Sequence, residues 1–229
     1  MERFDLSRIE DIGNCKKMGL KFPDSPSEVL AELIGAHYGD GSMSKSKNYS
    51  YCISYWGNLS KDSEYLLYLN EIIFSLFNIK FKLKKIEKRN TLALYKDSKK
   101  LFYFYKRCLG IEPGPKKSLR IPDYIKENKR LLIMFIRGLF DTDGCVTLQR
   151  DRGYKYILIK LCTKHKGFAE DIKQELAGLG LKSFITRKTW KNNVGYDVVL
   201  RYKNASDFFA LIGSSNIRNR NKFIRLVSS

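Results

Sequence analysis

Two similar segments, 103 residues apart, constrain this chain more than any other feature. The first, LIGAHYGDG, ends in Asp40-Gly41, and the second, IRGLFDTDG, ends in Asp143-Gly144. We call Asp40 and Asp143 the motif aspartates. Each segment closes an apolar run of helical character and is followed by alternating, strand-like sequence. The spacing predicts two similar halves that face each other through these segments.

Small residues recur on both predicted helices. Gly35 and Gly39 lie four residues apart in the first helix, and Gly138 and Thr142 match them in the second. A glycine inside a helix costs about 1 kcal/mol relative to alanine. A sequence that keeps two of them in one helix therefore needs another backbone to approach closely. We predict that Gly35 and Gly138 lie at a helix–helix interface and that the motif aspartates meet at one end of it.

The order of elements after each motif is also repeated. In the first half the pattern predicts strands at 42–46 and 49–55, a helix at 64–77, strands at 81–86 and 92–96, and a helix at 101–110. In the second half it predicts strands at 145–149 and 154–161, a helix at 167–180, strands at 184–190 and 195–203, and a helix at 207–213. Turns are expected at Lys47-Asn48, Arg89-Asn90, Arg152-Gly153 and Asn192-Asn193. The offset of 103 residues is expected to hold without a gap from the motif aspartates to the next helix.

These elements predict an α+β fold with two pseudo-symmetric αββαββα halves. The expected boundaries are a lead-in at 1–24, a first repeat at 25–110, a linker at 111–122 rich in Pro, Gly and Lys, and a second repeat at 123–229. Ser25-Pro26-Ser27-Glu28 predicts the start of the first helix, with Ser25 as the cap and Pro26 at the first helical position. Ile121-Pro122-Asp123 opens the run that leads into the second motif.

The charge of the chain indicates a polyanionic partner. Lys and Arg number 43 against 24 Asp and Glu, which gives a formal net charge of +19. Basic side chains gain affinity for nucleic acids by displacing counterions condensed on the phosphates. Nucleic acid is therefore the expected partner.

Cysteine usage and hydropathy indicate the compartment. The five cysteines, Cys15, Cys52, Cys108, Cys145 and Cys162, form no Cys-x-x-Cys pair. This argues against a zinc site or a disulfide framework and for a reducing compartment. No apolar run approaches the roughly 20 residues of a membrane span, and the N-terminus lacks a signal-peptide core. We expect a soluble intracellular protein without a membrane partner, in the cytoplasm of a prokaryote or in an organelle.

The motif aspartates have the chemistry of a divalent-metal site. A carboxylate at a helix C-terminus is unfavourably placed because the helix dipole is negative there, and two such carboxylates repel each other. A divalent cation resolves both problems, and oxygen ligands favour Mg²⁺, with Mn²⁺ as a substitute. Together with the basic charge, this predicts hydrolysis of phosphodiesters by a metal-activated water.

The two segments resemble the paired motifs of the LAGLIDADG homing endonucleases, in the single-chain form. The first matches the motif at its first, third, eighth and ninth positions; the second has Gly138, Leu139, Asp141, Asp143 and Gly144 in place. The resemblance covers the element order from about residue 25 to about residue 213. His37 departs from the usual apolar residue, and Asp141 shares its motif position with Tyr38, so Asp141 is interpreted as helix-end structure or weak support.

The resemblance implies a monomeric, site-specific double-strand DNA endonuclease of intron homing. Two four-stranded antiparallel sheets would form a saddle over the DNA, with the motif helices at the interface. The motif aspartates would carry the metal ions, and the residues that precede them, Gly39 and Thr142, are included in the predicted metal site. Family members also place basic side chains around the metal-bound waters. The internal alignment nominates two pairs, Lys61 with Lys164 and Lys96 with Lys203, and favours the second pair because both follow a tyrosine at a strand end.

Strand alternation predicts the side chains that read DNA. If Met43 and Val146 point toward the helices, the DNA-facing residues are Ser42, Ser44, Ser46, Thr147 and Gln149. Lys84 and Arg187 are aligned as equivalents and are expected to face DNA as well. Because the two halves differ at these positions, the target is expected to be long and asymmetric.

Two alternatives on the same scaffold remain open. One is a maturase that binds intron RNA and assists splicing, and the other is a DNA-binding regulator without cleavage. Only His37 and His165 are present, too few for a histidine-metal nuclease. No splicing-domain signals flank the repeats, so an intein is not expected.

Overall fold

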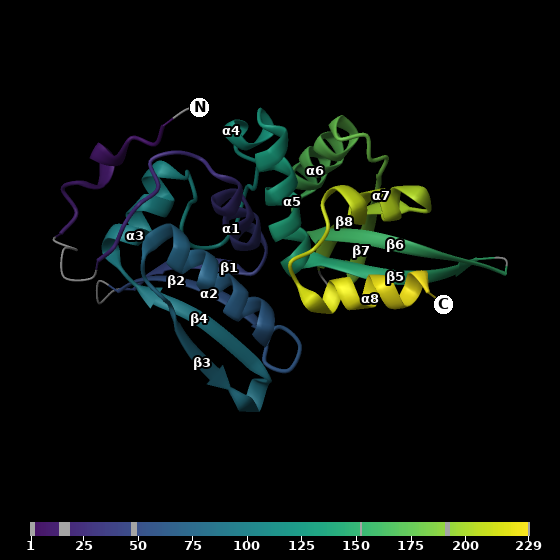
Figure 1. Cartoon of the computed structure of the whole chain (residues 1–229), viewed down its shortest axis with the longest axis horizontal. Coiled ribbons are helices and arrows are strands. Elements are labelled where there is room, and N and C mark those ends of the chain that lie inside the picture. The colour runs from purple at the N-terminus through teal and green to yellow at the C-terminus, as the bar shows by residue number, and fades with distance from the viewer. Residues whose placement is uncertain (1–2, 14–18, 47–49, 152, 191–192, 229) are drawn as a thin grey trace.

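Helices α1 (Glu28–Gly39) and α5 (Lys129–Asp143) lie side by side at the centre of the molecule, with one sheet on either side (Figure 1). The computed structural model describes the chain except residues 1–2, 14–18, 47–49, 152, 191–192 and 229. Each central helix leads directly into the first strand of its own half. The two sheets are therefore anchored at the same end of the helix pair.

Each half contains one four-stranded antiparallel sheet, as the predicted fold class requires. The first has the order β1-β2-β4-β3, from β1 (Gly41–Lys45), β2 (Tyr51–Asn58), β3 (Lys82–Ile86) and β4 (Thr91–Asp97). The second has the order β5-β6-β8-β7, from β5 (Gly144–Asp151), β6 (Tyr154–Thr163), β7 (Phe184–Trp190) and β8 (Asn193–Arg201). The identical order in both halves confirms the α+β fold with two αββαββα repeats.

The remaining helices follow the strands in the same order in both halves. They are α2 (Ser63–Phe77) and α3 (Lys99–Tyr103), which continues into a π-helical turn η4 (Phe104–Cys108), then α6 (Lys166–Gly178) and α7 (Lys203–Leu211). Short segments are η1 (Leu6–Ile9), η3 (Glu87–Arg89) and α4 (Asp123–Lys126), and the last helix is α8 (Ile217–Val227). Among the described residues, no helix combines the length and the apolar character needed to cross a bilayer.

The main core lies between the helices and one face of each sheet. Met43, Ile53 and Leu94 project from the first sheet into this core, and Val146, Ile159 and Leu200 project from the second. The apolar residues of α2 and α6 complete it. Alternation along each strand then leaves the other face uncovered by helices, and we call it the open face.

The contact between α1 and α5 is backbone against backbone. A Cβ atom built on Gly35 would overlap the carbonyl oxygen of Phe135, and one built on Gly138 would overlap the carbonyl oxygen of Glu32. These atoms belong to the main chain, so they cannot move aside as a flexible side chain would. Gly35 and Gly138 thus lie at the predicted interface, and each leaves room for the opposite helix.

Helix boundaries differ from the sequence interpretation in three places. The cap of α1 is Ser27, whose hydroxyl accepts a hydrogen bond from the Leu30 N–H at 3.2 Å, so the predicted cap at Ser25 is wrong. The run before the second motif is split into α4 and α5, because Asn128 caps a new helix with its side-chain oxygen. Helix α8 was not predicted at all.

The predicted gapless register is also wrong. Gly41 pairs with Tyr55, whereas Gly144 pairs with Leu161, so the hairpin of the second half is three residues longer. A correspondingly shorter loop before α6 restores the offset of 103 residues. The offset alone concealed these two compensating changes.

Of the four predicted turns, the one at Arg89-Asn90 is described, and Asn90 there adopts a left-handed conformation with φ of 46°. The turns at Lys47-Asn48, Arg152-Gly153 and Asn192-Asn193 fall wholly or partly outside the described residues, as does Cys15. The four described cysteines are free.

Replacing Gly138 with alanine should weaken the helix pair. We expect Gly138→Ala to lower the free energy of unfolding by about 1–3 kcal/mol, because the added methyl group overlaps a backbone carbonyl that cannot move aside cheaply. Urea denaturation measures the change. The matched control is Gly178→Ala on α6, where a Cβ meets nothing within 4 Å. The control should leave stability unchanged or raise it by up to about 1 kcal/mol, and equal losses in both variants would contradict the role of the interface.

Candidate functional site

The motif aspartates meet where α1 and α5 end. Asp40 is the C-cap of α1 and Asp143 is the last residue of α5. Between them, a Cβ built on Gly39 would overlap the Thr142 side chain and would lie 3.4 Å from the Asp143 carboxyl carbon. The backbone of Asp40 is also held by β2, because its carbonyl accepts the Trp56 N–H at 3.2 Å. Two carboxylates are thus fixed close together at two helix C-termini.

Both carboxyl groups are disfavoured as anions. Burial raises the pKa of Asp40 to about 7, and the negative charges of Asp143 and Asp62 add to the effect. Burial also raises the pKa of Asp143. The positive charge of Lys116 opposes both shifts, and Arg218 also opposes that of Asp40. Nearby cations therefore compensate part of the negative charge of each motif aspartate.

Lys116 lies in the segment that connects the two halves. It is a cation at this junction that the sequence did not nominate. Its ammonium group donates a hydrogen bond to the Tyr38 carbonyl at 2.9 Å and a second one to the Gly39 carbonyl. Burial lowers the pKa of Lys116, while Asp143 and Asp40 favour its charged form. The only signal in the sequence was a lysine pair after Pro-Gly-Pro in a presumed linker, and nothing local indicated that this linker returns to the end of α1.

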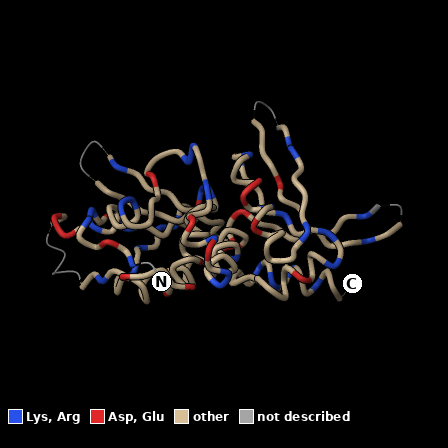
Figure 2. The backbone as a smooth tube through the Cα atoms, turned by 90° about the horizontal axis from the view of Figure 1, so that it is seen from above, with Lys and Arg blue, Asp and Glu red and all other residues tan. Residues whose placement is uncertain are grey.

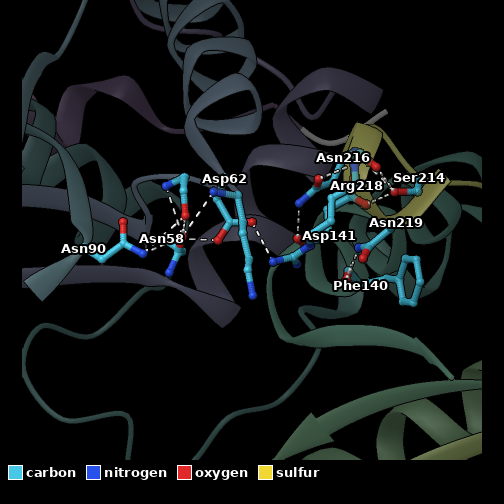
Figure 3. Close-up of polar contacts among 11 residues, drawn as sticks. Asn58, Asp62, Asn90, Phe140, Asp141, Ser214, Asn216, Arg218 and Asn219 are labelled. Carbon is cyan, nitrogen blue, oxygen red and sulfur yellow. Dashed lines mark hydrogen bonds and ion pairs between the residues drawn. The ribbon is translucent and has the colours of Figure 1, made fainter. Parts of the chain in front are cut away.

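The segment between α7 and α8 caps α5 in a comparable way (Figure 3). The Asn216 side-chain amide donates to the Asp141 carbonyl at 3.1 Å. The carboxyl group of Asp141 accepts bonds from the Ser214 hydroxyl and, at 2.7 Å, from the Ser215 N–H. Burial raises the pKa of Asp141 to about 7 despite these bonds. Asp141 therefore fastens the C-terminal segment to α5, as the helix-end interpretation anticipated, and does not project into the junction.

A polar chain links α8 to the first half (Figure 3). Arg218 at the start of α8 forms an ion pair with Asp62 at 2.7 Å. The other carboxyl oxygen of Asp62 accepts the Asn58 N–H at 2.9 Å, and the Asn58 side chain contacts Asn90 at 3.4 Å. Helix α8 is thereby tied to the loop between β2 and α2, on the Asp40 side of the junction.

A cavity of about 800 Å³ opens beside Asp143. It is lined by residues of α1, the connecting segment, the β6–α6 loop and the second sheet, which include Gly39, Lys116, Asp143, Lys164, His165, Lys188, Tyr196 and Asp197. The cavity joins a motif aspartate to several basic side chains, which is the arrangement needed to receive a phosphate group.

The four nominated lysines do not converge on the motif aspartates. Lys164 lines the cavity with Asp143, whereas Lys61 is exposed in the loop before α2. Lys96 pairs with Ile53 in the sheet and so has the strand parity of the helix-covered face. Lys203 is the first residue of α7, not the end of a strand, and its ammonium group is engaged by Asp207 at 2.8 Å. The premise that Lys96 and Lys203 both follow a tyrosine at a strand end is therefore wrong, because two tyrosine–lysine pairs of similar sequence occupy different secondary structure.

Most of the nominated DNA-reading residues share the open faces. In the first sheet, Ser42 pairs with Ser54, Ser44 pairs with Cys52, and Lys84 pairs with Ala93, all opposite in parity to Met43 and Ile53. Ser46 follows β1 and is held by Ser50. In the second sheet, Thr147 and Gln149 alternate with Val146, which is buried in the main core. Lys and Arg recur along the projecting hairpins of both halves (Figure 2).

Arg187 is the exception. It pairs with Tyr196, which pairs with Thr163, and this row has the parity of the helix-covered face. The residue equivalent to Lys84 is Thr186, because Thr186 pairs with Asp197 just as Lys84 pairs with Ala93. On the open face the basic residue of β7 is instead Lys188, which forms an ion pair with the buried Asp197. The offset is 103 residues at the start of α6 but 102 in β7, so the segment between them differs by one residue, and an alignment at 103 exchanges the two faces of the strand.

The two open faces differ in polarity. The first presents a row of Ser42, Ser54 and Tyr95, in which the two serine hydroxyl groups lie 3.4 Å apart. The second carries an apolar cluster separate from the main core, formed by Tyr156, Leu158 and Val199 with Phe184 packed against it. Arg201 lies over the Phe184 ring at 4.2 Å and covers part of this cluster. A ligand that spans both sheets would meet hydroxyl groups on one side and apolar surface on the other.

His37 departs from the motif without disturbing α1. It is buried, and its ring packs edge-on against Tyr55 and Tyr105 at centroid distances of 5.4 and 5.3 Å. Burial lowers the pKa of His37 to about 3, with a smaller contribution from Lys116. The imidazole is therefore neutral at physiological pH and serves as an aromatic core residue.

The donor set at the junction fits a hard divalent cation. No group of three or more His, Cys, Asp or Glu side chains gathers into a metal site within the part of the chain that the structure describes. The two motif aspartates instead form a pair of oxygen donors, one exposed and one half-buried, whose pKa values are raised mainly by desolvation. Mg²⁺ is typically bound by one or two carboxylates and completes its shell with waters and substrate phosphates.

Comparisons with known proteins identify relatives of this architecture. A model of the LAGLIDADG-like domain matches residues 130–213. The chain is 26% identical over 191 residues to uncharacterized protein MJ0314 of Methanocaldococcus jannaschii. This alignment covers 81% of this chain and 66% of that protein. It is 27% identical over 242 residues to the replication factor C small subunit of the same organism, which covers 98% of this chain but only 13% of that protein. It is 26% identical over 167 residues to homing endonuclease I-DmoI of Desulfurococcus mucosus, which covers 71% of this chain and 76% of that protein.

Solved structures show the same fold. I-DmoI in complex with DNA and Mn matches with a TM-score of 0.59 and 23% identity, covering 83% of this chain and 98% of that one. The N-terminal LAGLIDADG domain of DUF199/WhiA matches with a TM-score of 0.50 and 16% identity, covering 93% of this chain and 92% of that one. These matches confirm the resemblance to the LAGLIDADG family that the two motifs predict.

Replacing Asp40 should stabilise the metal-free protein at high pH. The folded-state pKa of Asp40 is about 7, above the value of about 3.9 in an unfolded chain. The folded state therefore holds this proton more tightly, and the stability it contributes is present below about pH 4 and is lost as the pH rises to about 7. Asp40 is exposed, so solvent screening leaves only part of this shift as a difference in stability. With EDTA present, we expect Asp40→Asn to raise the free energy of unfolding by about 0.5–1 kcal/mol at pH 8 and to change it little at pH 4.5.

Urea denaturation at the two pH values measures this difference. Asp123→Asn is the matched control, because the Asp123 side chain is 85% exposed. If Asp40→Asn raised the free energy of unfolding more at pH 4.5 than at pH 8, the raised pKa of Asp40 would be contradicted.

Proposed function

We propose that this chain, which has the LAGLIDADG fold and carries a LAGLIDADG-like domain in its second half, is a site-specific endonuclease that cuts both strands of DNA. The observation that carries the proposal is the junction of α1 and α5, where an exposed carboxylate, Asp40, and a half-buried one, Asp143, lie together at two helix C-termini with raised pKa values. A protein gains nothing in stability from such a pair, so its presence favours a catalytic use.

The substrate class follows from charge and relatives. The formal net charge is +19, and I-DmoI structures contain target DNA with Mn, Ca or Mg. Each open face offers a row of side chains at strand spacing, and two such rows, one on each side of the junction, suit a long duplex in a saddle. The chain thus has the parts of a single-chain enzyme that acts as a monomer.

The residues of this chain divide the work. Asp40 and Asp143, with the backbone of Gly39 and Thr142, would hold the metal, which when bound would activate a water and stabilise charge on the leaving oxygen. Lys164 lines the cavity beside Asp143 and is placed to hold a phosphate there.

The open faces would supply sequence recognition. Ser42, Ser44, Ser46 and Lys84 serve the first half, and Thr147 and Gln149 serve the second. Gln149 can bond an adenine edge through the carbonyl oxygen and the NH2 group of its side-chain amide, whereas serine and threonine accept several bases.

Selection from randomised duplex DNA should return a long, asymmetric sequence. The two open faces present different chemistry to the two half-sites, so equal half-sites would not be bound equally well. The measurement is binding selection with Ca²⁺ in place of Mg²⁺, followed by sequencing of the bound fraction. A perfectly palindromic consensus would contradict this prediction.

With the selected duplex, cleavage should require both motif aspartates. We expect Asp40→Asn and Asp143→Asn each to reduce the rate of double-strand cleavage in Mg²⁺ by at least about 100-fold, because each removes a carboxylate that would help to position the metal and its water. EDTA should abolish cleavage in the wild type. The matched control is Asp11→Asn, whose side chain is 73% exposed and which should cut at the wild-type rate.

Gel shift assays on the same variants separate binding from cleavage. Both active-site variants should still bind the selected duplex. Cleavage that survives either substitution would overturn the mechanism. Specific binding without any cleavage by the wild type would favour a DNA-binding regulator, and tighter binding of a structured intron RNA than of DNA would favour a maturase.

A further inference from the structure

Lys116 makes the charge at the two halves of the junction unequal. Its ammonium group donates to the carbonyls of Tyr38 and Gly39, the last two residues of α1. Lys116, Gly39 and Asp143 line the same cavity, and Asp40 is not among the described residues that line it. The half-buried side chain of Lys116 therefore supplies a positive charge on the Asp143 side of the junction.

In the other half, the described residues place no cation on the carbonyl that aligns with that of Tyr38. This carbonyl, of Asp141, accepts a hydrogen bond from the neutral side-chain amide of Asn216 at 3.1 Å. Arg218 lies nearby but is bonded to Asp62 at 2.7 Å, so its charge is shared with that carboxylate.

The groups that Lys116 serves are those that a hard cation seeks. Helix C-terminal carbonyls and an adjacent carboxylate together attract positive charge, whether it comes from an ammonium group or from a metal ion. An ammonium group on a tether has a higher local concentration than any ion in solution. It should therefore compete with a divalent cation for the Gly39 carbonyl and for Asp143.

We propose that the Lys116 ammonium takes the place of one divalent cation at this junction, so that metal is held mainly through Asp40 while Asp143 is neutralised by the lysine. The inference rests on the proposed function in one respect, namely that metal binds at the motif aspartates. It goes further in assigning different roles to the two aspartates of a pseudo-symmetric site.

Mn²⁺ binding to the metal-free full chain, followed by electron paramagnetic resonance of the free ion, tests the inference without DNA. Lys116→Met should bind about one additional Mn²⁺, or bind Mn²⁺ about tenfold more tightly than the wild type, because the competing charge is gone. Lys117→Met is the matched control, since the neighbouring Lys117 is exposed, and it should match the wild type. Equal Mn²⁺ binding by all three proteins would overturn the inference.

Thermal unfolding separates this role from simple helix capping. In EDTA, Lys116→Met should melt at a lower temperature than Lys117→Met, because two carbonyls and Asp143 lose their partner. Added Mn²⁺ should raise the melting temperature of Lys116→Met more than that of the wild type. If Lys116→Met melts lower than Lys117→Met in EDTA and yet gains no more melting temperature from Mn²⁺ than the wild type does, Lys116 only caps α1. That result would overturn the inference.

Variants that retain Lys116 keep the test independent of any folding defect in Lys116→Met. Asp40→Asn should abolish Mn²⁺ binding, whereas Asp143→Asn should largely retain it, and equal losses would overturn the inference.

The outcome is separable from the proposed function. A wild type that cuts no DNA, together with the Mn²⁺ pattern described, would refute the nuclease and leave the role of Lys116 supported. DNA cleavage together with equal Mn²⁺ losses would do the reverse.

Discussion

The close contact of α1 and α5 is the constraint on which the rest of the structure depends. Gly35 lies against the backbone of Phe135, and Gly138 lies against the backbone of Glu32. Since no side chain separates the two helices at these points, their C-termini end beside each other, and both sheets begin there. The positions of the two open faces, and the meeting of the motif aspartates, follow from this one contact. The LAGLIDADG fold of this chain is thus organised by the absence of side chains at two positions.

The same contact creates an electrostatic problem that each half solves with the segment following it. Two helix C-termini bring carbonyl groups and carboxylates into a partly buried space, where uncompensated negative charge is costly. After the first repeat, Lys116 returns to the end of α1. After the second, Ser214, Ser215 and Asn216 return to the end of α5. Geometry is conserved between the halves, but a charged group serves one and neutral groups serve the other.

The open faces show the same division between common geometry and different chemistry. Both sheets have four antiparallel strands in one order, yet serines line one face and an apolar cluster lies on the other. The strand order is set by the buried face, where any apolar residues of suitable size suffice. The open face is free of that requirement, so it can differ between halves and can be matched to a ligand without two-fold symmetry.

The sequence by itself determined the repeat, the fold class, the glycines of the interface and the pairing of Asp40 with Asp143, because these depend on short-range periodicity and on a spacing of 103 residues. It did not determine which lysines lie near the aspartates. Lys96 and Lys203 follow similar tyrosines, but one belongs to a strand and the other to a helix. A one-residue difference between the second helix of each half and the strand after it put Arg187 on the face opposite to that of Lys84. Lys116, Asn216 and Arg218 reach the junction only through the path of the chain after each repeat. Tertiary structure alone decided these contacts, because long-range return of a loop leaves no periodic pattern in the residues that make it.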